Sequence, residues 1–235
     1  MAKKNKEISS SNLIKVKAIT EGQKSVFETW KQGKNQFLFG CAGTGKTFIS
    51  LYLAMQDVLD LKTKYDKVIL VRSLIPTREI GFLPGDEEDK AALYQVPYQN
   101  MVKFMFEQPN EQAFNMLYDR LKNQGSLYFL STSFLRGLTF DNSIIIVDEC
   151  QNLNFHELDT ITTRVGQDSK IIFCGDFSQT DLLKQNERNG LHDFLRILEE
   201  MQEFNCVEFN IGDIVRSGFV RNYLIQKTKL GMGME

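Results

Sequence analysis

The sequence predicts an α/β domain in which a parallel β-sheet lies between layers of helices. The first observation is a series of short apolar runs, rich in strand-forming residues, that alternate with segments of helical composition. The second is that these runs are almost continuously apolar, as strands covered on both faces are. The third is a glycine-rich segment that joins the first run, 36–39, to an apolar helical segment at 48–55. A chain of 235 residues is long enough to bury the core of one such domain.

The elements before residue 73 follow from these patterns. The segment 22–33 is expected to form a short helix, because its apolar residues fall on one face and Gly33 follows them. Residues 36–39 and 67–72 are expected to be strands, and the helix between them is expected to end near Leu61.

A long loop is expected at 73–86, because this segment holds two prolines and two glycines. Loops of this length are usually functional, so we interpret it as a lid or as a contact segment for a partner or polymer. The acidic residues 86–89 are expected to cap the following helix, with a metal site as the alternative. The loop is followed by a helical region at 91–122 that is interrupted at Pro109. The loop and this region together form an expected helical insertion over about 73–125.

The later elements are predicted by the same signals. Asn154 is expected to cap a helix that Gly166 ends. A terminal helix is expected to end near Lys229, before a disordered tail at 231–235. The remaining expected strands are 127–130, 143–147, 170–174 and 206–209.

Composition restricts the classes of partner and compartment. The net charge is −2 and the pI is near 5.8, so the chain as a whole has no electrostatic attraction to nucleic acid. Residues 1–20 form a basic segment that is expected to be flexible. The four cysteines lack metal-binding spacing and are expected to be reduced core residues. No apolar run could span a membrane, which predicts a soluble, intracellular protein.

The glycine-rich segment matches G-x-x-x-x-G-K-[ST], the pattern of a phosphate-binding P-loop. Its residues are Gly40, Cys41, Ala42, Gly43, Thr44, Gly45, Lys46 and Thr47. Glycines let backbone N–H groups approach the phosphates, Lys46 supplies positive charge, and the Thr47 hydroxyl is a ligand for Mg²⁺. The helix that begins here adds further N–H groups. The motif predicts binding of a nucleoside triphosphate together with Mg²⁺.

Two carboxylates follow the strand expected at 143–147, in the form of a Walker B element. Asp148 is expected to bind Mg²⁺, directly or through water, and Glu149 to polarise the water that attacks the γ-phosphate. The alternative for such a pair is a solvated strand end. Gln179 lies just past another expected strand, where it is placed to sense the γ-phosphate.

Gln23 is a candidate for recognition of the base. It opens the first expected helix, and its amide offers one donor and one acceptor to an adenine edge. The alternative, a surface glutamine at a helix start, remains open at this point.

Several motifs taken together resemble the PhoH family of P-loop ATPases, which is similar to the first motor domain of superfamily 1 helicases. The matching segments are 40–47, 81–86, 134–139, 147–151, 175–181, 189–191 and 213–216. The segment 81–86 discriminates this family from general NTPases, and the likeness covers roughly Gln23 to Ile225. Cys41 and Cys150 depart from the usual pattern of the family without touching a ligand group.

The resemblance implies a RecA-like ATPase domain over 21–230 and a ring of identical subunits, commonly hexameric, with ATP at the subunit interface. It further implies a location in the bacterial cytoplasm, or in the host cytoplasm if a phage encodes the protein. It also implies an arginine finger that stabilises charge on the γ-phosphate. Arg216 matches the helicase-like motif that supplies this finger, and Arg72 and Arg136 are the competing candidates. Arg136 also resembles positions that face nucleic acid in related helicases. Candidate contacts to a polymer or a neighbouring subunit are Arg72, Arg78, Arg136 and Arg164.

The sequence therefore supports an ATP-hydrolysing motor or helicase-like remodeller that acts on RNA or single-stranded DNA. The alternative is an ATP-dependent switch or assembly protein that acts on a protein partner without nucleic acid. A small-molecule kinase is disfavoured, because Glu149 after Asp148 suits activation of water.

Overall fold

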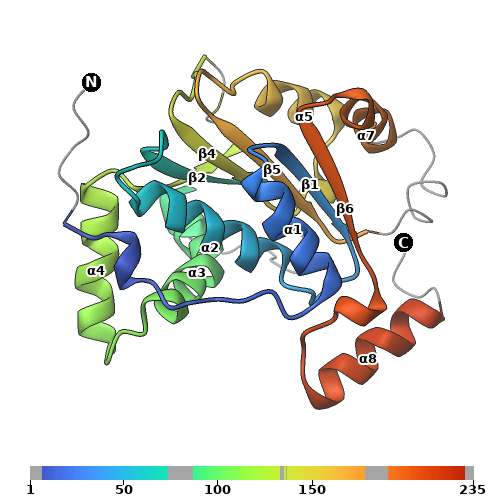
Figure 1. Ribbon diagram of the computed structural model, residues 1–235, viewed down its shortest axis with the longest axis horizontal. Helices are drawn as coiled ribbons and strands as arrows, with labels where there is room; N and C mark the ends of the chain where they lie inside the picture. The colour runs from blue at the N-terminus through green and yellow to red at the C-terminus, as the bar shows by residue number, and fades with distance from the viewer. Residues whose placement is uncertain (1–6, 74–86, 133–134, 136, 178–189, 231–235) are drawn as a thin grey trace.

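The computed structural model describes residues 7–73, 87–132, 135, 137–177 and 190–230, with the backbone alone for 87–93. In this part of the chain a single sheet of six parallel strands has the order β3-β2-β4-β5-β1-β6 (Figure 1). The strands are β1 (Asn35–Gly40), β2 (Lys67–Arg72), β3 (Leu127–Ser131), β4 (Ser143–Val147), β5 (Lys170–Gly175) and β6 (Phe204–Phe209). The predicted parallel sheet is confirmed, and the bounds of its strands agree with those expected to within two residues.

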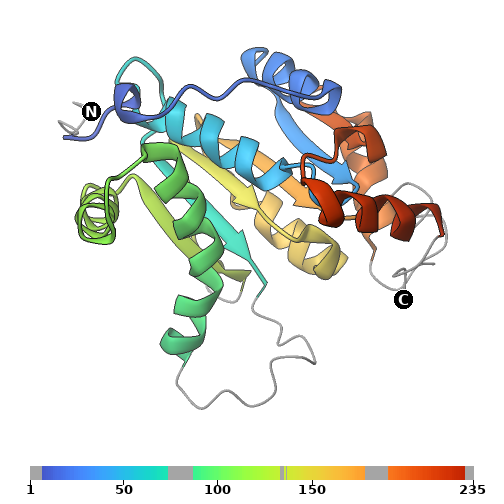
Figure 2. The ribbon, with the colours of Figure 1, turned by 90° about the horizontal axis from the view of Figure 1, so that it is seen from below.

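Helices cover both faces of the sheet, as Figures 1 and 2 show. One layer contains α1 (Glu21–Lys31), α2 (Lys46–Leu59), α3 (Glu87–Phe106) and α4 (Glu111–Asn123), and the other contains α5 (Phe155–Thr162) and α7 (Leu191–Glu200). Successive side chains of a strand point to opposite faces. In β4, Ile144 and Ile146 join the core under α2, while Ile145 and Val147 join the core under α5 and α7. This double burial explains the uninterrupted apolar runs.

The helical region expected at 91–122 forms α3 and α4, with the break at the predicted place. Asn110 caps α4 by accepting a hydrogen bond from the Ala113 N–H at 2.9 Å. The two helices connect β2 to β3, which are neighbouring parallel strands, so they occupy the position of the crossover that such strands require. The division into an ATPase domain and an insertion stays a prediction.

The end of α5 differs from the expected one. Asn154 caps this helix as predicted, in a capping box with Glu157, but the helix ends at Thr162 and the prediction that Gly166 ends it was wrong. The Gly166 N–H donates to the Phe140 carbonyl at 2.9 Å, and Val165 forms a β-bridge with Phe140. The chain therefore leaves the helix to pair with the segment before β4.

The segment 7–20, for which the sequence predicted flexibility, lies against α2 and α3. Ile8 and Leu13 are buried in the core on either side of the short 3₁₀ helix η1 (Ser10–Asn12). The Ile14 N–H donates to the Met105 carbonyl at 2.8 Å. Residues 1–6 and the expected disordered tail at 231–235 lie outside the described residues. None of the described helices is both long and apolar enough to cross a bilayer.

Candidate active site

A cavity of about 680 Å³ opens at the carboxyl edge of the sheet. Its walls are the P-loop, the ends of β2, β4 and β5, one face of α3, the N-terminal segment around Val16–Ile19, and the pair Val215 and Arg216. Ligands of open α/β sheets bind outside this edge, where the strand order brings several loops together. The cavity is therefore the candidate site.

The P-loop connects the end of β1 to the start of α2 and needs glycine at defined positions. Gly40 has a φ of 121°, and a side chain there would overlap the backbone of Phe209 in β6. Gly45, with a φ of 86°, directly precedes the first residue of α2. The loop thus turns closely around the start of α2 and presents the N-terminus of that helix to the cavity.

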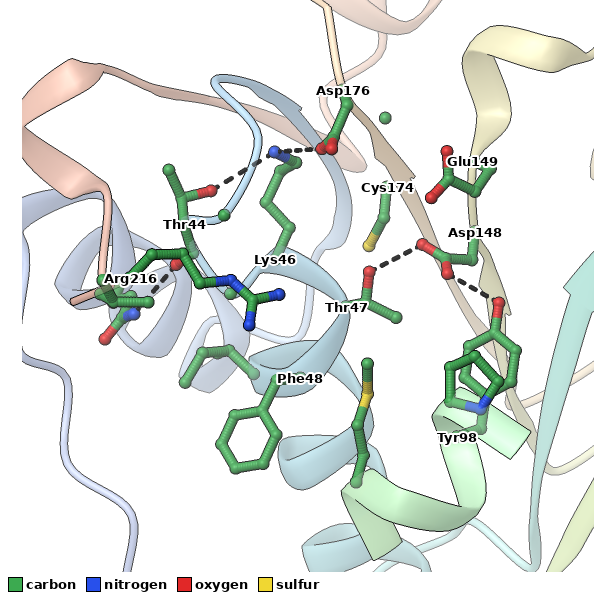
Figure 3. Close-up of a pocket in the computed structure, with 18 of the residues that line it drawn as sticks. Thr44, Lys46, Thr47, Phe48, Tyr98, Asp148, Glu149, Cys174, Asp176 and Arg216 are labelled. Carbon is green, nitrogen blue, oxygen red and sulfur yellow. Dashed lines mark hydrogen bonds and ion pairs between the residues drawn. The ribbon is translucent and has the colours of Figure 1, made fainter. Parts of the chain in front are cut away.

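Lys46 is buried, with 4% of its side chain exposed, and its ammonium group is held by the loop and by Asp176. The Nζ atom lies 2.7 Å from Asp176 Oδ1 and donates to the Cys41 carbonyl at 2.8 Å. Asp176 directly follows β5, so this ion pair connects the P-loop to the neighbouring strand (Figure 3). A phosphate that approaches Lys46 would compete with Asp176 for the same cation.

Thr47 and Tyr98 both hydrogen-bond to the carboxylate of Asp148 (Figure 3). The Thr47 hydroxyl donates to Oδ1 and the Tyr98 hydroxyl donates to Oδ2, each at 2.7 Å. Burial and the adjacent Asp148 raise the pKa of Tyr98, so its hydroxyl stays protonated and remains a donor. The predicted pair Thr47 and Asp148 is thus brought into direct contact.

The residues at this point fit Mg²⁺ and a nucleotide. Hydroxyl and carboxylate oxygens are the ligands that Mg²⁺ prefers, and it is commonly bound by one or two carboxylates together with substrate phosphates. No cluster of three or more His, Cys, Asp or Glu side chains suited to a metal occurs in the described ranges, so an all-protein cage is not the arrangement found there. Thr47 and Asp148 would hold the metal, and Lys46 with the loop amides would hold the phosphates.

Glu149 has a left-handed backbone conformation, with φ 54° and ψ 40°, at the start of the 3₁₀ helix η3 (Cys150–Asn152). Such a conformation is uncommon for a residue other than glycine and often occurs at functional sites. Glu149 Oε2 accepts a hydrogen bond from Gln151 Nε2 at 2.7 Å, and Gln151 Oε1 accepts one from the Asp176 N–H at 3.1 Å. Burial and the nearby Asp148 and Asp176 raise the pKa of Glu149, which suits a carboxylate that receives a proton.

Two of the candidate arginines line the cavity. Arg72 ends β2, and although burial lowers its pKa, the nearby Tyr98 and the negative charges of Glu149 and Asp148 raise it on balance. The exposed Arg216 follows the 3₁₀ helix η4 (Ile211–Asp213), packs on Gly43 and extends over the cavity (Figure 3). Both arginines therefore stay candidates for the predicted finger.

Four further candidates are not among the residues that the structure describes as lining the cavity. Arg164 lies after α5 and is not among the described residues that line it. Gln179, Arg78 and Arg136 lie outside the described residues, so their expected roles stay predictions.

Gln23 is buried, with 3% of its surface exposed, so the alternative of a surface glutamine was wrong. Its Nε2 donates to the Thr44 carbonyl at 3.1 Å, and its Oε1 accepts from the Ile19 N–H at 3.0 Å. Gln23 thereby joins the P-loop to the N-terminal segment and also lines the cavity. Its recognition of adenine stays a prediction.

Sequence reasoning missed three residues of the site: Tyr98, Gln151 and Asp176. Asp176 was predictable, because it is the first residue past β5 and polar residues just past a parallel strand lie at the ligand edge of the sheet. We applied the same argument to Gln179. Tyr98 had none, since it lies within a helix without a motif and meets Asp148 only through the packing of α3.

Comparisons with known proteins agree with this geometry. The family model described as PhoH-like protein matches residues 15–226. A PhoH-like protein of Synechocystis sp. is 32% identical over 207 residues, which cover 88% of this chain and 60% of that protein. Protein PhoH of Escherichia coli strain K12 is 33% identical over 190 residues, which cover 80% of this chain and 51% of that protein. The chain thus spans roughly half to three fifths of the length of these relatives.

A solved structure supports the fold. The large terminase of a thermophilic bacteriophage superposes with a TM-score of 0.51 at 11% identity, covering 90% of this chain and 50% of that one. This likeness concerns the arrangement of the chain alone. With its RecA-like parallel sheet, its P-loop and the match over 15–226, the chain belongs to the PhoH-like family of P-loop NTPases.

Proposed function

We propose that this chain hydrolyses ATP in the cavity described above and acts as a motor or helicase-like remodeller on RNA or single-stranded DNA. The observation that carries the ATPase proposal is the convergence of Lys46, Thr47, Asp148 and Glu149 on one cavity. Lys46 and Thr47 begin α2, directly after the loop that follows β1, and Asp148 and Glu149 follow β4. The two pairs lie close together because only β5 separates β1 from β4 in the sheet.

Each side chain has a role that its surroundings support. Lys46 and the loop amides bind the phosphates, and Thr47 and Asp148 orient the metal. When bound, Mg²⁺ neutralises charge on the β- and γ-phosphates. Glu149 accepts the proton of the attacking water, which its raised pKa favours. Arg216 or Arg72 stabilises the charge that develops on the γ-phosphate, an effect worth about 10³–10⁵ in rate for arginine fingers.

The helix α8 (Gly218–Lys229) supports contact with a single-stranded polymer. Phe219 and Tyr223 are 82% and 58% exposed, and their rings stack with centroids 6.4 Å apart. Residues 214–230 carry four basic side chains and no acidic one. Exposed aromatic rings beside cations suit stacked bases and phosphates. The helix also touches the P-loop, because Leu224 packs against Gly43, so binding at α8 is placed to affect the nucleotide.

The second candidate is an ATP-dependent switch that acts on a protein partner. The same helix favours it, because none of its residues is buried, and Val220 and the capping residue Leu230 are exposed in addition to the two aromatic rings. An apolar face of this kind also suits a protein surface.

The deciding experiment measures ATP hydrolysis with and without single-stranded RNA and DNA at two salt concentrations, with Lys46→Ala as the inactive control. Stimulation that weakens at high salt supports the nucleic-acid proposal, since phosphate contacts are salt-dependent. Hydrolysis that Lys46→Ala abolishes but neither polymer changes supports the switch. Equal phosphate release by wild type and Lys46→Ala would contradict the ATPase proposal itself.

We also propose a ring of identical subunits, for which the family resemblance is the support. Light scattering after gel filtration measures the mass of the assembly. Mixing Lys46→Ala with Arg216→Ala then tests where the finger acts. Recovered hydrolysis indicates that Arg216 serves a neighbouring subunit, whereas a mixture no more active than its components places it within its own subunit or outside catalysis.

A further inference from the structure

The carboxylate of Asp148 has a different donor on each oxygen. Thr47 from α2 binds Oδ1, and Tyr98 from α3 binds Oδ2, both at 2.7 Å. Asp148 itself is 7% exposed and Tyr98 is 2% exposed, so water has little access to either group. With one donor fixed on each oxygen, the orientation of the carboxylate plane is fixed.

The direction of the Tyr98 hydrogen bond is also fixed. A carboxylate only accepts hydrogen bonds, so the Tyr98 hydroxyl is the donor and its proton points to Asp148 Oδ2. The cation Arg72, at the end of β2, lies near the same hydroxyl. The ring is held as well, since it lies 5.7 Å from the Phe129 ring of β3 and belongs to the core that contains Val102 and Met105 of α3.

We propose that Tyr98 is a positioning residue for the Mg²⁺-binding carboxylate. By holding Oδ2, Tyr98 keeps Oδ1 directed at the Thr47 hydroxyl. Oδ1 of Asp148 and the Thr47 hydroxyl oxygen are then both available to the metal. This inference rests on the proposed nucleotide site. It assigns α3, a helix outside the P-loop and Walker B motifs, a direct part in forming that site.

The substitution Tyr98→Phe separates this role from packing, because the ring stays in the core and only the hydroxyl is lost. Asp148 Oδ2 then lacks its donor and the carboxylate is free to turn toward Arg72. Loss of a hydrogen bond to a metal-ligating group typically weakens metal binding by about 10- to 100-fold. We expect the Mg²⁺ concentration at half-saturation to rise by that factor.

The experiment titrates Mg²⁺ against wild type and Tyr98→Phe and follows the binding of a fluorescent ADP analogue, with ATP hydrolysis as the second measurement. The matched control is Tyr118→Phe, a buried tyrosine of α4 that packs on Phe114 away from the cavity. Binding of the analogue in EDTA and the thermal unfolding midpoint are measured for all three proteins. We expect Tyr98→Phe to change the Mg²⁺ dependence alone and Tyr118→Phe to behave as wild type.

Two results would overturn the inference while leaving the proposed function intact. One is an unchanged Mg²⁺ dependence in Tyr98→Phe. The other is equal weakening of binding in EDTA and in Mg²⁺, which would indicate a general effect on the site. If wild type neither binds the analogue in a Mg²⁺-dependent way nor hydrolyses ATP, the proposed function fails instead, and the inference fails with it.

Discussion

Lys170, the first residue of β5, is a buried cation whose charge costs stability at neutral pH. It is 2% exposed, its Nζ lies 4.0 Å from the centre of the Trp30 ring, and it donates to the Trp30 carbonyl at 3.3 Å. The Tyr65 ring is 5.9 Å away. Burial lowers the pKa of Lys170 from 10.5 to about 8, with Asp57 opposing this change and Lys64 adding to it.

The sign and size of the pH effect follow from this pKa. The unfolded chain, with a pKa near 10.5, binds the proton more tightly than the folded protein, so stability rises with pH between about 8 and 10.5. Each pKa unit corresponds to about 1.4 kcal/mol, which puts the cost of the charged group at about 3 kcal/mol. Between pH 7 and pH 9.5 the free energy of unfolding should therefore rise by about 2 kcal/mol of this cost.

The substitution Lys170→Met removes the titrating group and keeps an unbranched side chain. Urea unfolding followed by circular dichroism at pH 7 and pH 9.5 gives the free energy of unfolding of both proteins. We expect wild type to gain about 2 kcal/mol relative to the variant over this interval. Trp30 is the single tryptophan, so its fluorescence in the native protein should also change near pH 8 in wild type but not in Lys170→Met.

Lys67→Met, at the more accessible first position of β2, controls for the loss of a lysine as such. The reasoning would be refuted if the difference in the free energy of unfolding between wild type and Lys170→Met stayed constant from pH 7 to pH 9.5. Lys170 would then have the same pKa in the folded and unfolded states.

Two further substitutions test the loop and the proposed base. Gly40→Ala should lower the thermal midpoint of unfolding more than Gly33→Ala. Both glycines have a positive φ, which costs other residues about 1–2 kcal/mol. Only at Gly40 would the new Cβ also overlap backbone atoms, those of Phe209. Equal losses would show that this close approach is unimportant. Glu149→Gln should keep nucleotide binding and reduce the turnover number by about 10²–10⁴, because an amide cannot accept the proton of water. Phosphate release measures the effect, with the capping-residue variant Glu157→Gln as control, and unchanged turnover would exclude Glu149 as the base.

The strands and the phosphate loop were predictable because their signals are local. The run Ile144–Val147 is apolar at every position, which only burial on both faces explains, and the two carboxylates after it mark the ligand edge of the sheet. The contact of Thr47 with Asp148 then follows, since both residues lie at that edge although 101 positions separate them in the chain.

The features that escaped prediction depend on packing between distant segments. Tyr98 meets Asp148 because the packing of α3 brings this side chain to the residue that follows β4, and no residue pattern within α3 specifies this orientation. The early end of α5 has the same kind of cause, since the bridge between Val165 and Phe140 competes with another helical turn. The sequence indicates the groups that we propose to carry the chemistry, whereas the groups that hold them depend on the tertiary arrangement.

The N-terminal segment has a practical consequence for the preparation of this protein. Val16 and Ile19 form part of the cavity wall, the Val16 N–H donates to the Tyr52 hydroxyl at 3.2 Å, and the Ile19 N–H donates to Gln23. A truncation designed to begin at residue 21, where the first helix starts, would remove this wall and release Gln23. Expression vectors should therefore retain the chain from Glu7 onward, and affinity tags are better attached at a distance from residues 8–19.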